Sequence, residues 1–485
     1  MAGCYFLTSY GSQALVVSWL ILASLVFYAW DFPQYLFLLG SSILVNFTIA
    51  QLFLSREWTK RLKLSLLWLG IGFNVFLLGY FKYTNFFLDV FQDLAETQFT
   101  FERIVLPLGI SFITFQQIGF LMDAYIGQVK DLRFINYALF ICFFPQLIAG
   151  PICHHKTLLS QINEPNSISI NSRSMLIGSV FLCIGLFKKL FIADAIALFV
   201  NPVFDLAESG KGITFVEGWL AAVSYTLQVY FDFSGYSDMA IGLGAMFSLR
   251  IPVNFRSPYK SASITEFWQR WHITLGDFLT KYIYTPIHIG LHRRFGKNSV
   301  LVRQSLAPSI AILLTLMISG FWHGAGFQFI VFGIIHGVAL IVHRFWQRST
   351  IGRRFASWPH WILVARTMTF LFIIVTLVIF RAGTLQAGFS YVQTLFGLHG
   401  FELESSVGRK LPIVVLSGLL LWIHLLPNSQ ELMQRVTVGV PTENNADWKW
   451  YHFTPTFRWA VACAFLLVLS VACLSRTQEF IYYHF

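Results

Sequence analysis

The chain has 485 residues, of which 56% are hydrophobic and only 12% are charged, whereas a soluble domain usually carries about 25% charged residues. With a mean hydropathy of +0.63, this composition excludes an ordinary soluble enzyme and predicts an all-α, polytopic membrane protein. The net charge of +11 fits short cytoplasmic loops facing anionic lipid. Because the basic residues are scattered along the chain, nucleic acid is not an expected partner.

The N-terminal part predicts membrane-spanning helices. A secretory signal needs a basic start, and the first basic residue here is Arg56, so we expect the first apolar stretch to remain as a span. Apolar segments cover residues 14–30, 32–54 and 64–81. The basic loop after the second segment is expected in the cytoplasm, and the acidic loop 82–103 on the other side.

The next two apolar segments contain unusual residues for a span. Residues 104–122 are rich in Gly, Ser, Thr and Gln, which is typical of close helix packing. Residues 134–152 end with Pro145, Gly150 and Pro151, which predicts an irregular segment lining a cavity. Cys153, His154 and His155 follow, but three adjacent side chains point in different directions, so we predict no metal site.

Charged residues interrupt the segments at 174–200 and 215–249. Lys188 and Lys189 are expected to reach toward a membrane surface, although an anionic ligand is the alternative. Asp232 and Asp238 lie among aromatic residues. Each either caps a helix after a break or belongs to a functional site, and the sequence does not choose between these roles.

A basic loop and an amphipathic segment follow. Arg256 and Lys260 mark a loop expected in the cytoplasm. Residues 264–290 contain Arg270 and His272 and predict an amphipathic helix followed by an irregular segment.

Residues 304–343 form a stretch without Asp, Glu, Lys or Arg. The basic residues that close both ends are Arg293, Arg294, Lys297, Arg303, Arg344, Arg348, Arg353 and Arg354. If both flanks are cytoplasmic, the stretch must enter the membrane and return, and two spans of roughly 20 residues leave nothing for a turn. We therefore predict a short or tilted helical hairpin that bends near Gly324. An ionisable group such as His323 beside that bend is costly in a membrane, which favours a function.

The remaining apolar segments are 361–380, 411–426 and 459–474, separated by loops at 383–410 and 427–458. We count about eleven spans plus one or two re-entrant pieces. Because no repeat, low-complexity tract or soluble domain is visible, we predict a single integral membrane domain over residues 1–485.

Several long motifs, in order along the chain, resemble the membrane-bound O-acyltransferase family, especially its bacterial alginate O-acetyltransferase branch. They are LVFYAW (25–30), LPLGISFITFQQIGFLMD (106–123), FFPQLIAGPI (143–152), YFDFSGYSDMAIGLG (230–244), NFRSPYK (254–260), FWQRWHITL (267–275), FWHGAGFQF (321–329) and FIYYHF (480–485). Two positions depart from the family pattern: His288 stands in place of a glycine, and His154-His155 in place of an Arg-Tyr-like pair.

The resemblance implies an acyltransferase whose helices ring a central funnel that is open to both faces. It implies that His323, in the WHG motif, is catalytic and that His272, in the RWHITL motif, is the second characteristic polar residue. It further implies a multi-pass protein of the bacterial inner membrane, in contact with membrane lipid. Acetyl-CoA would be the cytoplasmic donor with no tightly bound cofactor, and a periplasmic SGNH-type partner would complete transfer to a polysaccharide such as alginate.

The chemistry of acyl transfer suggests roles for these residues. A hydroxyl acceptor must lose its proton as it attacks, and a neutral imidazole can take that proton. We assign this role to His323, although a transient acyl carrier is the alternative. His272 would orient the acceptor or the thioester, or donate to the developing oxyanion. Arg256, Lys260 and Arg270 are candidates for binding the coenzyme A phosphates.

Three other functions stay open at this point. Two keep the enzyme class and change the product: peptidoglycan O-acetylation, or D-alanyl transfer to teichoic acid. The third is a transporter or channel. Transporters often carry inverted repeats, and none is visible in the sequence.

Overall fold

The computed structural model describes residues 3, 12–30, 32–55, 57–97, 99–165, 167–295, 299–402, 410–434, 449–478 and 480–481, with the side chains of 410–412 left out. Cys4, Asp31, Arg56, Lys297 and the last four residues of the FIYYHF motif lie outside these ranges. Every regular element within them is a helix. This confirms the predicted fold class.

Six helical runs are long and apolar enough to cross a membrane: Tyr35–Ser55, Lys60–Ala95, Ser172–Glu208, Val302–His323, Phe327–Arg348 and Trp361–Arg381. Three shorter apolar helices are Gln13–Ala29, Ile413–Leu425 and Phe457–Ala472. The chain therefore has the helices of a multi-pass membrane protein, and the count of eleven spans stays a prediction. The chain divides into two compact units, residues 1–182 with 239–252, and residues 183–238 with 253–485. The prediction of a single domain also stays a prediction.

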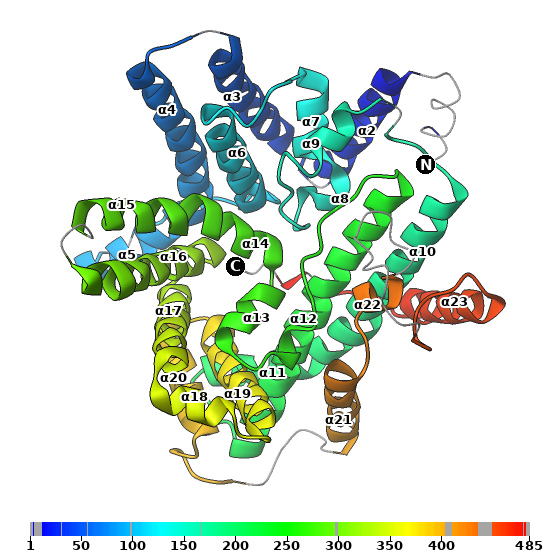
Figure 1. The fold of residues 1–485 in the computed structure, drawn as a ribbon. Coiled ribbons are helices and arrows are strands. Elements are labelled where there is room, and N and C mark those ends of the chain that lie inside the picture. The colour runs from blue at the N-terminus through cyan, green and yellow to red at the C-terminus, as the bar shows by residue number, and fades with distance from the viewer. Residues whose placement is uncertain are drawn as a thin grey trace. The chain divides into compact units, whose positions relative to one another are not determined.

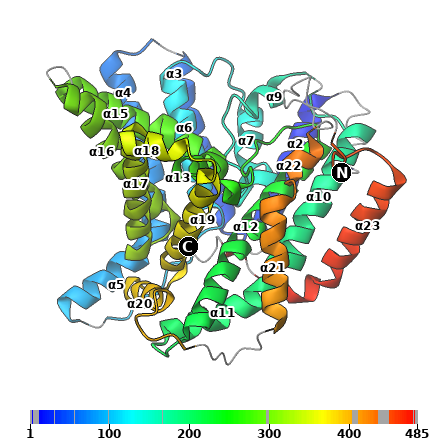
Figure 2. The ribbon, with the colours of Figure 1, turned by 60° about the horizontal axis from the view of Figure 1, so that its bottom comes forward.

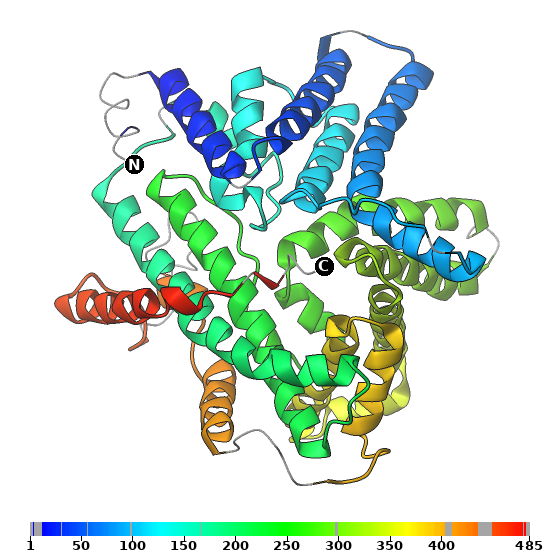
Figure 3. The ribbon, with the colours of Figure 1, turned by 180° about the vertical axis from the view of Figure 1, so that it is seen from behind.

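The first unit is drawn mainly in blue and cyan in Figures 1 and 3. Its helices are α2 (Gln13–Ala29), α3 (Tyr35–Ser55), α4 (Lys60–Leu78), α5 (Thr84–Ala95), α6 (Ile110–Tyr125), α7 (Phe134–Cys142), α8 (Phe144–Leu147) and α9 (Leu159–Asn163). Helices α3, α4 and α6 pack together. The amides of Asn46 on α3 and Asn74 on α4 donate to each other at 3.2 and 2.6 Å, which satisfies two polar groups that would be costly in lipid.

Two predictions for the first unit meet different outcomes. The irregular segment near Pro145 is confirmed, because α7 ends at Cys142 and the short α8 begins at Phe144, whereas its place at a cavity stays a prediction. The loop expected at 82–103 is wrong over much of its length: η1 (Gly79–Tyr83) continues α4 into α5. Phe86, Phe87 and Phe91 give α5 an apolar face, and that face favours a helix over a loop.

The second unit contains most of the residues predicted to be functional. Its elements are η2 (Phe187–Ala193), α11 (Asp194–Glu208), η3 (Pro258–Lys260), α13 (Ile264–Arg270), α14 (Ile273–Leu279), η4 (Thr280–Tyr284), α15 (Thr285–Phe295), η5 (Val302–Leu306), α16 (Ala307–His323), α17 (Phe327–Arg348), α18 (Thr350–Ala356), α19 (Trp361–Arg381), α20 (Leu385–Leu395), α21 (Lys410–Leu425), α22 (Ser429–Met433), α23 (Phe457–Ala472) and η6 (Leu474–Arg476). Helices α10 (Ser172–Leu186) and α12 (Phe215–Met246) contribute residues to both units. Figure 2 shows α17, α19 and α20 beside one another.

Two predictions for the second unit are corrected by the structure. At 264–290 we predicted an amphipathic helix followed by an irregular segment, and the second part is wrong. The chain breaks only at Trp271 and His272, and then stays helical from Ile273 to Phe295. The loop expected at 383–410 contains α20. Here Thr384 caps the first turn by accepting from the Ala387 N–H at 3.1 Å, which is a helix-start signal that the sequence alone left ambiguous.

Candidate active site

The hairpin of α16 and α17 presents His323 at its bend. Helix α16 ends at His323 and α17 begins at Phe327, so the predicted bend near Gly324 is confirmed. The two helical runs are 22 residues each, longer than the short hairpin that we predicted. The reason is that the helices continue through Arg303 and Arg344, whose long side chains carry their charge away from the helix axis.

Small residues let the two arms of the hairpin pack closely. A Cβ on Gly320 would overlap the carbonyl oxygen of Phe329, and a Cβ on Gly333 would overlap that of Leu316. Glycines at such helix contacts allow backbones to approach each other. His323 lies one turn after Gly320, so this close packing fixes the backbone position from which the His323 imidazole projects.

His272 is positioned by the break between α13 and α14. Its backbone lies in the left-handed region, with φ 45° and ψ 53°, which costs energy for a residue other than glycine. The break is held by backbone bonds, because the Ile273 N–H donates to Asn254 O and the Arg256 N–H to Arg270 O, both at 3.0 Å. The strain directs His272 inward, where only 1% of its surface is exposed.

The tautomer of His272 follows from its partner Asn254. The Asn254 side-chain atom assigned as Oδ1 receives the Thr274 backbone N–H at 3.2 Å, so it must be the acceptor oxygen. His272 Nδ1 lies 3.1 Å from the same oxygen and must therefore donate a proton to it. In the neutral ring the lone pair then resides on Nε2, the nitrogen suited to accept a proton or a hydroxyl hydrogen bond.

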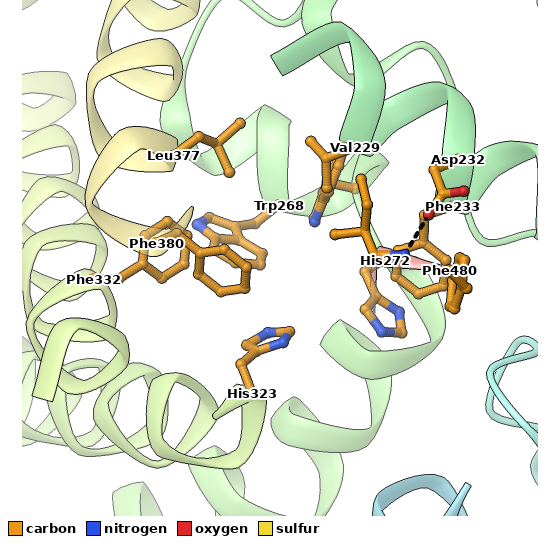
Figure 4. A pocket seen from close by; sticks show the side chains of 12 residues that line it. Val229, Asp232, Phe233, Trp268, His272, His323, Phe332, Leu377, Phe380 and Phe480 are labelled. Atoms are coloured by element: carbon orange, nitrogen blue, oxygen red, sulfur yellow. Dashed lines mark hydrogen bonds between the residues drawn. The ribbon is translucent and has the colours of Figure 1, made fainter. Parts of the chain in front are cut away.

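One cavity collects both histidines (Figure 4). The residues that line it are Val229, Asp232, Phe233, Trp268, Trp271, His272, His323, Phe332, Leu377, Phe380, Phe480 and Ile481. The His323 ring contacts two aromatic rings, with centroid distances of 5.0 Å to Trp322 and 5.4 Å to Phe380. The His272 ring contacts Phe233 edge-on at 4.8 Å. The structure thus brings the two predicted catalytic residues to one apolar space.

Asp232 is a cavity residue whose role the sequence left open. It lies inside α12 rather than at a helix start, so the capping interpretation is wrong. Its Oδ1 is 2.7 Å from Lys189 Nζ, and its Oδ2 accepts from the Ile481 N–H at 2.9 Å. Lys188 and Lys189 are only 7% and 8% exposed, so the prediction that they reach toward a membrane surface is also wrong.

Trp268 and His336 form a supporting pair that sequence reasoning missed. Trp268 lines the cavity, and its indole N–H donates to His336 Nδ1 at 3.2 Å. Nδ1 is therefore the acceptor, and in the neutral ring His336 Nε2–H donates to Thr376 Oγ1 at 3.1 Å. A histidine inside the uncharged stretch 304–343 was the available signal, but its partners on α13 and α19 are remote in sequence.

Arg256, Lys260 and Arg270 do not line the cavity. Arg256 and Arg270 are joined by the backbone bond described above, and Arg270 also pairs with Glu266 at 2.6 Å. Lys260 Nζ donates to Leu426 O at 2.7 Å. Lys260 lies outside the helices that could span a membrane. Burial lowers the pKa of its ammonium, Glu431 raises this pKa, and Arg270 and Arg366 lower it further. Lys260 and Arg270 therefore lie close enough to repel each other, and neighbouring positive charges of this kind attract anions.

The comparisons with known proteins show the family of this chain. A family model of membrane-bound O-acyltransferases, MBOAT, matches residues 121–383, which is more than half of the chain and includes both cavity histidines. The chain belongs to the membrane-bound O-acyltransferase family. The resemblance inferred from the motifs is thereby confirmed, and the protein is an O-acyltransferase.

Two named relatives span most of this acyltransferase, and a third matches half of it. It is 38% identical to a peptidoglycan O-acetyltransferase of Helicobacter pylori, over 98% of this chain and 87% of the relative. It is 35% identical to a protein of Pseudomonas putida named probable alginate O-acetylase AlgI, over 92% and 88%. A teichoic acid D-alanyltransferase of Streptococcus thermophilus is 28% identical over 50% and 58%.

The acyltransferase also brings Asp123, His154 and His155 together in its first unit. Their potential metal-binding atoms all lie within 4.8 Å of one another. However, His154 Nδ1 accepts from the Lys156 N–H at 3.2 Å, so a neutral His154 carries its proton on Nε2, which faces Asp123 at 2.5 Å. A metal-binding histidine normally donates its second ring N–H instead. The geometry therefore favours a carboxylate held by hydrogen bonds over a metal centre.

Proposed function

We propose that this acyltransferase of the bacterial inner membrane takes an acetyl group from cytoplasmic acetyl-CoA and supplies it for O-acetylation of an envelope polysaccharide. The observation that carries the proposal is the pair of imidazoles, His272 and His323, facing one apolar cavity. Membership of the O-acyltransferase family and relatives named as O-acetyltransferases support it. The architecture of about eleven spans around a two-sided funnel belongs to the same proposal.

The proposed chemistry assigns one proton transfer to His323. As the acceptor oxygen attacks the thioester carbonyl carbon, its hydroxyl proton passes to the His323 imidazole. The carbon–sulfur bond then breaks, and the coenzyme A thiolate leaves and takes the proton back from the imidazolium. In an apolar cavity, the stability of the tetrahedral intermediate depends strongly on correctly placed hydrogen-bond partners.

His272 orients the reacting hydroxyl in this proposal. Its Nδ1–H is directed at Asn254 Oδ1, so the neutral ring offers the Nε2 lone pair to the acceptor hydroxyl. Of the roles expected from sequence, orientation of the acceptor fits this tautomer. Donation to an oxyanion does not, because it requires a second N–H and hence a protonated ring.

An uncharged acyl group fits the cavity better than a D-alanyl group. D-alanyl esters carry an ammonium, which needs a counter-charge when it is removed from water. Among the described residues that line the cavity, the acidic side chain is Asp232, and Lys189 and the Ile481 N–H already bind its carboxylate. This observation favours acetyl over D-alanyl transfer.

The donor and acceptor sides of the proposal rest on different support. Arg256, Lys260 and Arg270 would attract the coenzyme A phosphates through their positive charges. For the acceptor, the names of the relatives support two polymers, an exopolysaccharide such as alginate and peptidoglycan. The higher identity over more of the chain favours peptidoglycan. A periplasmic SGNH-type partner that completes the transfer belongs to the proposal in either case.

Purified protein with labelled acetyl-CoA tests the chemistry, and cell-wall analysis tests the acceptor. We expect label transfer in the presence of polymer and partner, and a loss of about 10²–10⁴-fold for His323→Ala. The matched control is His343→Ala, on α17, the other arm of the hairpin, because the His343 ring bonds Thr265 and does not line the cavity. Undiminished transfer by the His323 variant would reject the proposal.

Loss of O-acetyl groups from peptidoglycan in a deletion strain, with exopolysaccharide unchanged, would identify peptidoglycan as the acceptor.

A further inference from the structure

The described residues Gln478, Phe480 and Ile481, here called the C-terminal segment, contribute to the reaction cavity. Phe480 and Ile481 line the same space as His272 and His323, and Figure 4 shows Phe480 beside His272. The Phe480 ring packs against Phe233 and Tyr236 of α12, with centroid distances of 5.8 and 5.0 Å. These residues are remote in sequence from the rest of the cavity, so something must hold them there.

A buried charge network contacts the backbone of this segment at two points. Lys189 Nζ donates to the Gln478 carbonyl oxygen at 3.1 Å, and the Ile481 N–H donates to Asp232 Oδ2 at 2.9 Å. Lys189 Nζ also lies 2.7 Å from both Asp194 Oδ1 and Asp232 Oδ1. One lysine and two aspartates, all from η2, α11 and α12, thus bind both a carbonyl and an amide of the segment.

The burial of these charges explains why the network is selective for one geometry. Asp194 and Asp232 are each 1% exposed, and Lys189 is 8% exposed. Buried charges are costly unless their hydrogen-bonding positions are filled, and a network that is only partly satisfied is unfavourable. Moving the segment would remove a carbonyl from Lys189 and an amide from Asp232, so the segment and the network stabilise each other.

We propose that Lys189, Asp194 and Asp232 act as a clamp that holds Gln478 and Ile481, and with them Phe480, as one wall of the cavity. Lys189 and Asp232 are then positioning residues for acyl transfer, and the clamped wall limits the space open to the acyl group. This inference rests on the proposed acetyl transfer, but the position of the wall can be measured without it.

The chain offers a matched control for the clamp. Lys188 on η2 and Asp238 on α12 form a second buried pair, with 2.6 Å between Nζ and Oδ2. Lys189 and Asp232 of the clamp lie on the same two elements. That pair binds Ser429 and Gln430 of the α22 region instead of the C-terminal segment. Lys188→Met therefore reports the general cost of breaking a buried pair on these elements.

The first experiment measures exposure of the wall. Ile481→Cys is introduced after replacing the six native cysteines, and its reaction with a soluble maleimide is timed. We expect Asp232→Leu and Lys189→Met to speed labelling about tenfold or more, since local opening then costs less. Asp232→Asn keeps an acceptor for the Ile481 N–H and should fall between, and it remains informative if Asp232→Leu does not fold. Equal labelling in all variants, or equal acceleration by Lys188→Met, would overturn the clamp.

The second experiment measures acyl selectivity with acetyl-CoA and propionyl-CoA. Loosening the wall should lower kcat for acetyl transfer by about 10²-fold, the effect of roughly 1 Å of misplacement, and raise the propionyl-to-acetyl ratio. Lys188→Met should leave that ratio unchanged. An unchanged ratio in Asp232→Asn and Lys189→Met would count against the clamp. If the wild-type protein transfers no acyl group at all, the proposed function fails and the labelling result alone decides the clamp.

Discussion

Two places in this molecule bring two histidines and an aspartate together, with opposite results. In the first unit, Asp123 Oδ2 lies 2.5 Å from His154 Nε2 and 3.0 Å from His155 Nδ1. In the second unit, the carboxylate of Asp232 binds Lys189 and a backbone amide, while His272 and His323 line a cavity. In the first group the carboxylate and the imidazoles contact one another directly. In the second, His272 and His323 line a cavity that a substrate can occupy.

The comparison shows that residue types alone do not make an active site. A carboxylate that contacts imidazoles directly occupies the nitrogens needed for proton transfer. Where a lysine neutralises the carboxylate instead, and an asparagine fixes one tautomer, both imidazoles line the cavity.

The largest expected difference separates His323 from His155. His323→Gln should lower acetyl transfer about 10²–10⁴-fold because the general base is lost, whereas His155→Gln should leave the rate per folded molecule close to wild type. The rate is measured with labelled acetyl-CoA and normalised to folded protein by size-exclusion chromatography. Similar losses in both variants would mean that the two groups do not differ in function.

Asn254 tests whether the His272 tautomer matters. Asn254→Leu removes the acceptor of the Nδ1–H, and we expect a loss of about 10–100-fold in kcat, the range typical for residues that orient a functional histidine. Asn254→Asp retains an acceptor oxygen and should recover part of the rate. If the leucine and aspartate variants are equally slow, the tautomer is not the cause.

Gly320 tests whether the hairpin positions His323. Gly320→Ala introduces a Cβ into the Phe329 carbonyl, so α16 and α17 must separate, at a cost of about 1–3 kcal/mol in stability and about tenfold in kcat through misplacement of the base. Gly418 on α21 is the control, because a Cβ there meets nothing within 4 Å. Thermal melting and kinetics of both alanine variants check this, and a tolerated Gly320→Ala would show that the packing of the hairpin does not position His323.

The basic residues outside the cavity should affect donor binding alone. Arg256→Gln with Lys260→Gln should raise KM for acetyl-CoA about 3–10-fold and leave kcat unchanged, with a smaller effect at high salt because exposed charges are screened. Arg353→Gln, on the exposed surface of α18, is the comparison. A fall in kcat without a change in KM would contradict donor binding.

The smallest effect on activity is expected for Asp123. Asp123→Asn weakens the contacts of the carboxylate with His154 and His155, so the free energy of unfolding should fall by about 1–3 kcal/mol. The rate per folded molecule should stay the same. Denaturation in detergent measures the first quantity, and the acetyl-transfer assay measures the second. A lost activity with unchanged stability would place this group in the chemistry after all.

The sequence was most informative where a local rule applied. The bend of the hairpin followed from Gly324 and from the length of the uncharged stretch, and His323 and His272 followed from motifs. It failed for Lys188, Lys189 and Asp232, because burial of a lysine depends on which carboxylates the fold brings to it. It also failed for Trp268 and His336, whose contact joins α13 to α17.

The sequence by itself determined that this chain is an all-helical membrane O-acyltransferase with two histidines of interest, because hydropathy and long motifs are properties of the chain in order. Only the tertiary structure decided which charges are neutralised, which tautomer His272 adopts, and that Phe480 and Ile481 border the cavity. Those features depend on contacts between residues that are remote in sequence, such as Lys189 with Gln478 and Asp232 with Ile481. Such contacts arise only when the packed helices bring them together.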